Sequence, residues 1–248
     1  MEAKKVVFYP GCTVNYFDQE TGTDIVKIMR NNNIEVVVPK FVCCSMTLFY
    51  SGDIDYARLR AAELVKILSP LVEQGYEIIV SCPSCLYALK EVYPSLLGSS
   101  QAQNVAEKTR LFSQYLLDLH KKKELKADFR AKPLLIAYHA PCHLQTQDLP
   151  TVSAQLMQLV PETSVITLDR GCCGMGGTWG MHSKHQNKVS AHVGSDLFKA
   201  VEETNPQLIA TDCFGCQIQI ASHTNKRVIH PVKFIAEALN LPHKSAKE

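Results

Sequence analysis

Residues 77–85 read Glu77-Ile78-Ile79-Val80-Ser81-Cys82-Pro83-Ser84-Cys85, an apolar run that leads into a C-x-x-C motif. A second segment of the same form, residues 207–216, reads Gln207-Leu208-Ile209-Ala210-Thr211-Asp212-Cys213-Phe214-Gly215-Cys216. Neither apolar run alternates with polar residues, which is typical of strands buried on both faces of a parallel sheet. The sequence therefore predicts two buried strands, each followed directly by two cysteines.

The ten cysteines of this 248-residue chain form one pattern that occurs twice. Each copy contains a single cysteine, an adjacent pair and a C-x-x-C, and equivalent cysteines are separated by 129 to 131 residues. The two sets are Cys12, Cys43, Cys44, Cys82 and Cys85, and Cys142, Cys172, Cys173, Cys213 and Cys216. A repeat of this length corresponds to a small domain rather than to a solenoid unit. We therefore predict a first domain at residues 1–125 and a second at residues 126–248.

The segments between the cysteines indicate an α/β fold. Short apolar runs precede the remaining cysteines at residues 5–9, 34–38, 134–138 and 164–168. Apolar residues at three- and four-residue spacing predict amphipathic helices over residues 56–73 and over a later stretch that includes Val189, Val193 and Leu197. Alternating strands and helices form parallel βαβ units. The predicted fold is two duplicated Rossmann-like domains, with the cysteines at the carboxyl ends of the strands.

The region between the two domains contains a helix and a charged stretch. The pattern predicts a continuous helix over residues 104–119. Residues 120–130 are rich in lysine and lack turn glycines, so we interpret them as a solvated linker or helix end. The domain boundary is placed in this stretch.

Composition excludes several classes of protein. The chain has 26 Lys and Arg against 24 Asp and Glu, a balance that does not indicate nucleic-acid binding. Its longest charge-free apolar stretch, residues 78–89, is shorter than the ~18 residues that a membrane span needs. The first residues lack the apolar region of a secretory signal. We therefore expect a cytoplasmic protein whose cysteines serve metal or redox chemistry.

Parallel α/β sheets bind ligands at the carboxyl ends of their strands, so each set of five thiols should meet at one edge of a sheet. Thiolates are soft ligands that suit zinc or an iron–sulfur cluster. Structural zinc takes four ligands, and a fifth thiol favours an iron–sulfur cluster over zinc. Zinc at one or both sites, disulfides, and a thioredoxin-like dithiol at Cys82 and Cys85 are the alternatives.

Residues near the cysteines distinguish the two sets. Glycines follow the second adjacent pair, from Gly174 onward, whereas Ser45 takes the place of Gly174 in the first set. His139 and His143 flank Cys142, and we interpret them as hydrogen-bonding or proton-delivering neighbours of the site, or as structural residues. We interpret His230 as a core histidine. We interpret Trp179, the single tryptophan, as a residue that fills the interface between the domains, with packing over a cluster as the alternative.

These motifs resemble the cysteine-rich CCG domain family, whose pattern is a cysteine, a distant Cys-Cys-Gly and a distant C-x-x-C, usually duplicated. Its members include the B subunit of heterodisulfide reductase and the C subunit of anaerobic glycerol-3-phosphate dehydrogenase. Residues 8–12, 81–85, 172–180 and 211–213 are most similar to the latter. The resemblance implies a [4Fe–4S] cluster on each set of five cysteines, noncubane as in the heterodisulfide reductase relatives. Zinc or a cubane cluster is the alternative at one site, and Ser45 directs that alternative to the first.

The resemblance implies an iron–sulfur subunit without flavin that passes electrons from a flavoprotein dehydrogenase towards quinone. Relatives of this kind usually carry a ferredoxin-like segment, which is not found in this sequence, so we expect such clusters on a ferredoxin-type partner. The protein would then lie in the cytoplasm, held at the inner face of the membrane through its partner. Two alternatives remain: a catalytic subunit that reduces a disulfide, as in heterodisulfide reductase, and a zinc-stabilised scaffold without redox activity.

Overall fold

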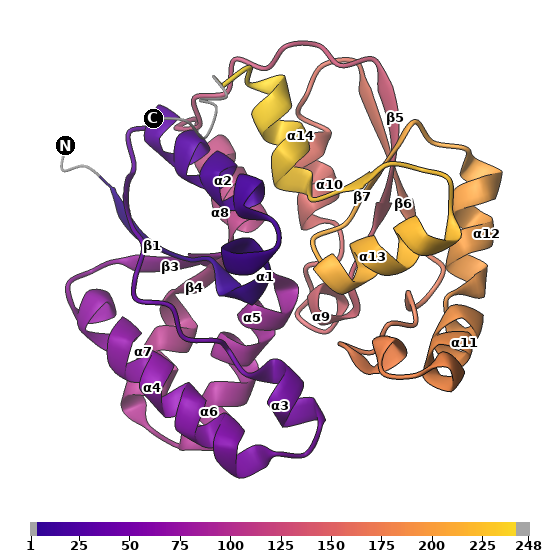
Figure 1. Ribbon diagram of the computed structural model, residues 1–248. Coiled ribbons are helices and arrows are strands. Elements are labelled where there is room, and N and C mark those ends of the chain that lie inside the picture. Colours follow the sequence, from indigo (N-terminus) through magenta and orange to yellow (C-terminus); the bar gives the residue numbers. More distant parts are fainter. Residues whose placement is uncertain (1–3, 242–248) are drawn as a thin grey trace.

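The computed structural model describes residues 4–241 and contains two four-stranded sheets in which every strand pair is parallel. The first sheet has the order β2-β1-β3-β4 and the second β6-β5-β7-β8. The strands are β1 (Lys5–Tyr9), β2 (Glu35–Val37), β3 (Glu77–Val80), β4 (Thr109–Leu111), β5 (Leu134–His139), β6 (Thr163–Leu168), β7 (Leu208–Ala210) and β8 (Val228–Ile229). The two orders correspond strand for strand, which confirms the predicted α/β class with duplicated parallel units (Figure 1).

Helices connect the strands of each repeat. Those of the first repeat are α1 (Gly11–Tyr16), α2 (Gln19–Asn31), α3 (Met46–Tyr50), α4 (Ile54–Glu73), α5 (Pro83–Tyr87), the π-helix η1 (Ala88–Val92), α6 (Tyr93–Leu97), α7 (Ser100–Lys108) and α8 (Phe112–Lys121). Those of the second are α9 (Cys142–Gln145), α10 (Val152–Met157), the 3₁₀ helix η2 (Trp179–Met181), α11 (Lys184–Val193), α12 (Ser195–Thr204), α13 (Phe214–His223) and α14 (Pro231–Ala238).

The six strands that the apolar runs predict are all present, but the fourth strand of each sheet is not evident from the sequence. The predicted continuous helix over residues 104–119 is wrong, because β4 separates α7 from α8. Strand β4 has three residues and pairs in register with β3, with Ile78 opposite Thr109. A run this short has no periodicity of its own, so its conformation is imposed by the neighbouring strand.

The predicted amphipathic helix of the second repeat is also different in the structure. It is divided at Gly194 into α11 and α12, and only α12 buries its apolar face, through Leu197 and Val201. Val189 and Val193 on α11 are 39% and 52% exposed. The prediction of one amphipathic helix is therefore wrong over α11, and only the part that forms α12 has a buried apolar face.

The two repeats pack directly against each other. Helix α14 lies beside α2 of the first repeat, and α10 lies beside α8 (Figure 1). The buried Ser153 hydroxyl on α10 is 2.8 Å from the Ser113 hydroxyl on α8. Lys233 on α14 forms 2.8 Å ion pairs with Asp18 and Glu20 of the first repeat. The interface between the repeats thus combines helix packing, a buried hydrogen bond and ion pairs.

The chain between the repeats is extended. Residues 124–133 contain no helix or strand, in agreement with the predicted linker after α8. The linker is nevertheless attached to the first repeat, because the Lys126 amide donates to Asn32 Oδ1 at 2.6 Å.

Candidate metal centres

All ten cysteines lie just beyond the carboxyl ends of strands, where the sequence pattern predicts them. In the first repeat, Cys12 lies in α1 directly after β1, and Cys43 and Cys44 lie in the loop that follows β2. Cys82 is the N-cap of α5, and Cys85 lies within this helix. The second repeat has the same arrangement around β5, β6 and β7, with Cys213 as the N-cap of α13. Because the strands of each sheet are parallel, each set gathers at one edge of its sheet.

The thiols of each set contact one another in the same order. In the first set, Cys85 Sγ is 3.5 Å from Cys44 Sγ. In the second set, the equivalent atoms of Cys216 and Cys173 are 3.1 Å apart. Hydrogen bonds extend both contacts outward, from Cys44 through Cys43 to Cys12, and from Cys173 through Cys172 to Cys142. Within the C-x-x-C motifs, Cys82 is also hydrogen-bonded to Cys85, and Cys213 to Cys216. Each set is therefore one continuous group of five sulfur atoms.

In each set, two cysteines have a lowered pKa, which favours the thiolate: the first of the adjacent pair and the first of the C-x-x-C motif. Hydrogen bonding from Cys12 lowers the pKa of Cys43, and hydrogen bonding from Cys142 lowers the pKa of Cys172. At the C-x-x-C motifs, hydrogen bonding from Cys85 lowers the pKa of Cys82 to about 7, and hydrogen bonding from Cys216 lowers the pKa of Cys213. Thiolates are the form of cysteine that binds metals. Each set thus presents two thiols that are readily deprotonated.

Ser45 and Gly174 place their backbone in the same way, although the residue types differ. Ser45 has a φ of 60° and Gly174 a φ of 86°, both in the left-handed region. Their amides donate to the sulfur two residues earlier, at 3.4 Å to Cys43 Sγ and 3.3 Å to Cys172 Sγ. Glycine is required only in the second set, where a Cβ atom would lie 2.0 Å from the carbonyl oxygen of Ser190. The replacement by serine therefore leaves this N–H···S contact of the first set in place.

Two further observations show space and donors suited to a metal group. A Cβ atom on Gly11 would lie 2.9 Å from Cys85 Sγ, so this glycine lets the backbone approach the first set. His139 is buried, and its Nδ1 atom has no hydrogen-bond partner. The donor atoms of His139, Cys173 and Cys216 lie within 4.8 Å of one another. An unpartnered buried nitrogen beside soft thiolates fits a bound metal or metal cluster.

Tyrosines that the sequence analysis did not single out position the adjacent cysteines of the first set. The Tyr9 hydroxyl donates to the carbonyl of Val42 at 2.8 Å, and the Tyr93 hydroxyl donates to the carbonyl of Cys44 at 2.9 Å. Both tyrosines are buried. Tyr93 is 49 residues from Cys44 in the sequence. No local pattern links residues so far apart, so only the tertiary structure identifies this role.

The two sets lie on facing sides of the boundary between the repeats. Ser84, between Cys82 and Cys85, has its hydroxyl oxygen 2.9 Å from Nδ1 of His143, which follows Cys142. Phe17 of the first repeat stacks on Phe214, which follows Cys213, with ring centroids 5.7 Å apart. The two sets are therefore neighbouring parts of one region rather than separate sites at opposite ends of the molecule.

Comparison with known proteins supports this description. The cysteine-rich CCG domain family matches residues 6–90 and residues 136–221, which are the two repeats. The chain belongs to the CCG family. The C subunit of anaerobic glycerol-3-phosphate dehydrogenase from Escherichia coli strain K12 is 31% identical over 240 residues, which are 95% of this chain and 59% of that protein. This CCG chain thus spans less than two thirds of that relative.

Two other relatives match this CCG chain over most of its length. An uncharacterized iron-sulfur protein of Methanocaldococcus jannaschii is 27% identical over 88% of this chain and 41% of its own. Lactate utilization protein A of Bacillus pumilus is 28% identical over 95% of this chain and 99% of its own. Similarity to an iron–sulfur protein agrees with the soft ligands of the two cysteine sets. Within residues 4–241, none of the helices combines the length and the apolar character that a membrane span requires.

The structure also places the histidines near the CCG motifs. His143 lies between the two repeats, with Nδ1 2.9 Å from Ser84 Oγ. His230 is buried and caps α14, as its interpretation as a core histidine predicts: Nδ1 accepts from the Val232 amide, and Nε2 donates to the Ser81 carbonyl at 3.2 Å. Trp179 is 41% exposed on η2, so the prediction that it fills the interface between domains is wrong.

Proposed function

We propose that this chain is the iron–sulfur electron-transfer subunit of an oxidoreductase complex. The observation that carries the proposal is the presence of two matching groups of five thiols on facing sides of the boundary between the repeats. The first cluster would be held by Cys12, Cys43, Cys44, Cys82 and Cys85, and the second by Cys142, Cys172, Cys173, Cys213 and Cys216. We assign the first group to a domain of residues 1–125 and the second to a domain of residues 126–248.

Each group would hold a [4Fe–4S] cluster, which accepts and donates single electrons when bound. Five thiols exceed the four that a cubane cluster requires, so they fit a noncubane cluster. The amides of Ser45 and Gly174 point at ligand sulfurs, and such hydrogen bonds raise the reduction potential of a cluster. Zinc or a cubane cluster in the first group is the alternative.

We propose that the electrons come from a flavoprotein dehydrogenase related to glycerol-3-phosphate dehydrogenase, directly or through a ferredoxin-type partner, and pass towards quinone. The similarity to the C subunit of the anaerobic glycerol-3-phosphate dehydrogenase supports this partner. Free thiols in this number suit a reducing compartment, so we place the protein in the cytoplasm. Attachment to the inner face of the membrane would then depend on the partner.

The proposal is tested by measuring iron, sulfide and zinc in anaerobically purified protein, together with its EPR spectrum. We expect about eight irons and eight sulfides per chain and no zinc, as two four-iron clusters require. About four irons with one zinc would restrict redox activity to one group. Zinc alone, with no visible absorption after anaerobic reconstitution, would contradict the proposal and leave a structural scaffold.

Serine variants at equivalent positions show which cluster signal in the EPR spectrum belongs to which group of cysteines. Cys12→Ser and Cys142→Ser remove the same position from the first and the second group. We expect each variant to lose one cluster signal and keep the other, so that each serves as the control for the other. Loss of both signals in either variant would show that the two groups do not bind clusters independently.

A further inference from the structure

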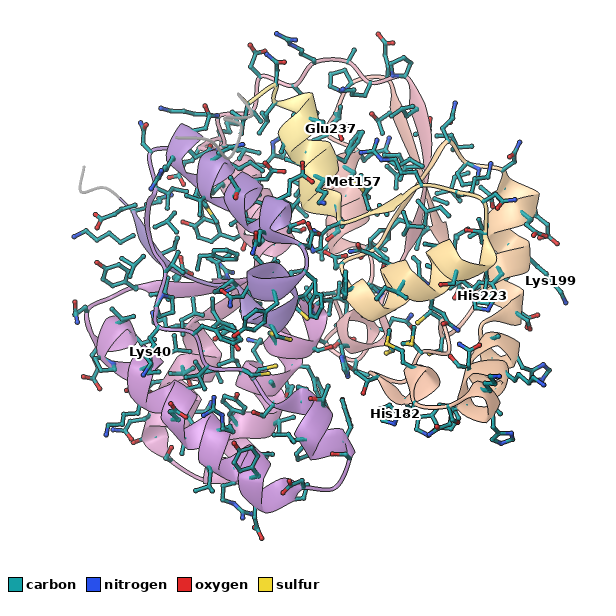
Figure 2. All side chains as sticks on the ribbon, viewed as in Figure 1. Lys40, Met157, His182, Lys199, His223 and Glu237 are labelled. Atoms are coloured by element: carbon teal, nitrogen blue, oxygen red, sulfur yellow. The ribbon has the colours of Figure 1, made fainter. Side chains whose placement is uncertain are left out.

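The second set of cysteines has a nitrogen donor beside it, on His139. This residue ends β5, three residues before Cys142, and its side chain is only 1% exposed. One of its ring nitrogens and the sulfur atoms of the buried Cys173 and Cys216 all lie within 4.8 Å of one another. Figure 2 shows sulfur atoms, in yellow, grouped beside α13, the helix that carries Cys216 and ends at the labelled His223. The imidazole is thus a sixth donor at this set.

The other two histidines near the CCG motifs have both ring nitrogens occupied. His143 Nδ1 is 2.9 Å from Ser84 Oγ, and its Nε2 is 2.5 Å from the Tyr50 hydroxyl. Both nitrogens of His230 are hydrogen-bonded to backbone groups. In contrast, Nδ1 of His139 has no hydrogen-bond partner within residues 4–241. Because nearly all buried polar groups in proteins have a partner, this nitrogen points to a bound metal group or a bound water.

The matching position of the first repeat is filled by a different residue. Tyr9 ends β1 as His139 ends β5, and the two are separated by 130 residues, as the cysteines are. The Tyr9 hydroxyl donates to the Val42 carbonyl at 2.8 Å. The phenol therefore uses its polar atom on the backbone, whereas the imidazole keeps a donor atom free. The two sets share their sulfur geometry but differ by one nitrogen.

We propose that His139 is a ligand of the metal group held by the second set, bound through an imidazole nitrogen beside Cys173 and Cys216. This inference rests on the proposed function. The neutral imidazole of histidine is the commonest metal ligand in proteins. It can therefore join the thiolates, whereas the phenol of Tyr9 is already engaged.

The nitrogen ligand would set the direction of electron flow between the two groups. Iron–sulfur centres with imidazole ligands have higher reduction potentials than centres with thiolates alone. The N–H···S contacts of Ser45 and Gly174 are nearly equal in length, so they do not distinguish the two groups. The second group would then have the higher potential. One electron would leave the first group, which is oxidised, and enter the second, which is reduced, and no covalent bond changes.

A buried water is the alternative explanation of the free nitrogen. In the described part of the chain, Thr211 Oγ1 is also buried without a partner. Thr211 follows Ala210, which pairs with Tyr138 in the neighbouring strand, so a water could bridge Thr211 and His139. Ligation is favoured because the nitrogen is grouped with two thiols, and imidazole and thiolate are both ligands of iron and zinc.

The test uses anaerobically purified full-length protein in which the histidines carry ¹⁵N. Pulsed EPR of the paramagnetic state detects a nitrogen bound directly to iron by its strong hyperfine coupling. We expect this coupling in the wild type and in His143→Phe, and its loss in His139→Phe. His143→Phe is the matched control, because it removes a histidine whose nitrogens are both hydrogen-bonded. His139→Gln, which keeps a polar side chain at the buried position, should also lose the coupling and retain its iron.

Redox titration provides a second measurement, which a merely structural role of His139 would not change in this way. We expect two midpoint potentials in the wild type, of which His139→Gln lowers the higher and leaves the lower unchanged. A fall of the lower potential alone would contradict the assignment to the second set.

The outcomes separate ligation from its alternatives. If the wild type contains iron but no strongly coupled histidine nitrogen, a water or a hydrogen bond to the group explains His139, and the inference is wrong. Persistence of the coupling in both His139 variants would also overturn it. Absence of iron in the wild type would instead contradict the proposed function.

Discussion

His143 Nδ1 lies 2.9 Å from Ser84 Oγ and thereby joins the two cysteine sets. His143 directly follows Cys142 of the second set, and Ser84 lies between Cys82 and Cys85 of the first. The imidazole also stacks on Tyr87, with ring centroids 5.0 Å apart and planes 5° from parallel. This contact between the repeats is thus made by residues adjacent to the thiols themselves.

Replacement of His143 by phenylalanine should weaken this connection. The aromatic ring retains stacking on Tyr87 but removes the hydrogen bonds to Ser84 Oγ and to the Tyr50 hydroxyl, which should lower the unfolding free energy by about 0.5–1.5 kcal/mol for each bond. Urea unfolding of the anaerobically purified protein measures the change. His185→Phe, at an exposed position on α11, is the control and should change stability by less than about 0.5 kcal/mol. Equal effects of the two variants would contradict the role of His143.

The two residues after the adjacent cysteine pairs should respond differently to substitution. Gly174→Ala places a methyl group 2.0 Å from the Ser190 carbonyl, so we expect the second set to lose its metal and the iron content to fall by about half. Ser45→Gly removes the strain of a left-handed serine, which stabilises the native protein. Glycine also gives the unfolded chain more conformational freedom, which destabilises the native protein. Because the two effects oppose each other, the unfolding free energy should change by no more than about 1 kcal/mol. Iron analysis and thermal unfolding check both. Full iron content in Gly174→Ala would show that α11 is not held as closely as described.

Stability should decrease as the pH falls below about 6.5. Burial lowers the pKa of His139 to about 4 and also lowers the pKa of His143 and of His230. Between pH 6.5 and the lowered values, the unfolded chain binds protons that the native protein does not, so the unfolding free energy rises with pH in this range. Each histidine contributes up to about 1.4 kcal/mol per pH unit. Urea unfolding at pH 7.5, 6.5 and 5.5 measures the slope, and His139→Gln should reduce it. A slope of the opposite sign would contradict this prediction.

The ion pairs of Lys233 should contribute measurably to the packing of the repeats. Burial acts to raise the pKa of Asp18, but hydrogen bonds from Lys233 and Thr21 outweigh burial and lower it. Lys233→Met removes a hydrogen bond to a charged group that is largely shielded from solvent, which should cost about 1.5–3 kcal/mol. Lys199→Met is the matched control, because Lys199 and Asp196 form an exposed pair at 3.8 Å that should contribute less than about 1 kcal/mol. Thermal unfolding compares the two variants.

The sequence alone predicts the strand framework and the positions of all ten cysteines. Six apolar runs become strands. The four inner strands, β1, β3, β5 and β7, are buried along most of their length, as a segment buried on both faces must be apolar throughout, whereas the edge strands β2 and β6 are partly exposed. The constant separation of equivalent cysteines identifies the duplication. Parallel strands then bring the cysteines of each set to one edge of a sheet, so the grouping of five thiols follows from order and topology without any knowledge of side-chain contacts.

The tertiary structure decides what lies around these thiols. Residues that are distant in sequence, such as Tyr93 and Cys44 or His143 and Ser84, meet only through packing, and no local pattern records their contact. Strand β4 exists because β3 offers it hydrogen-bonding partners. On α11, the close backbone contacts at Gly174 and Gly194 bury Ser190 against the cysteine loop and leave Val189 and Val193 exposed. Periodicity specifies that a helix has an apolar side, but the close backbone contacts decide which side is buried.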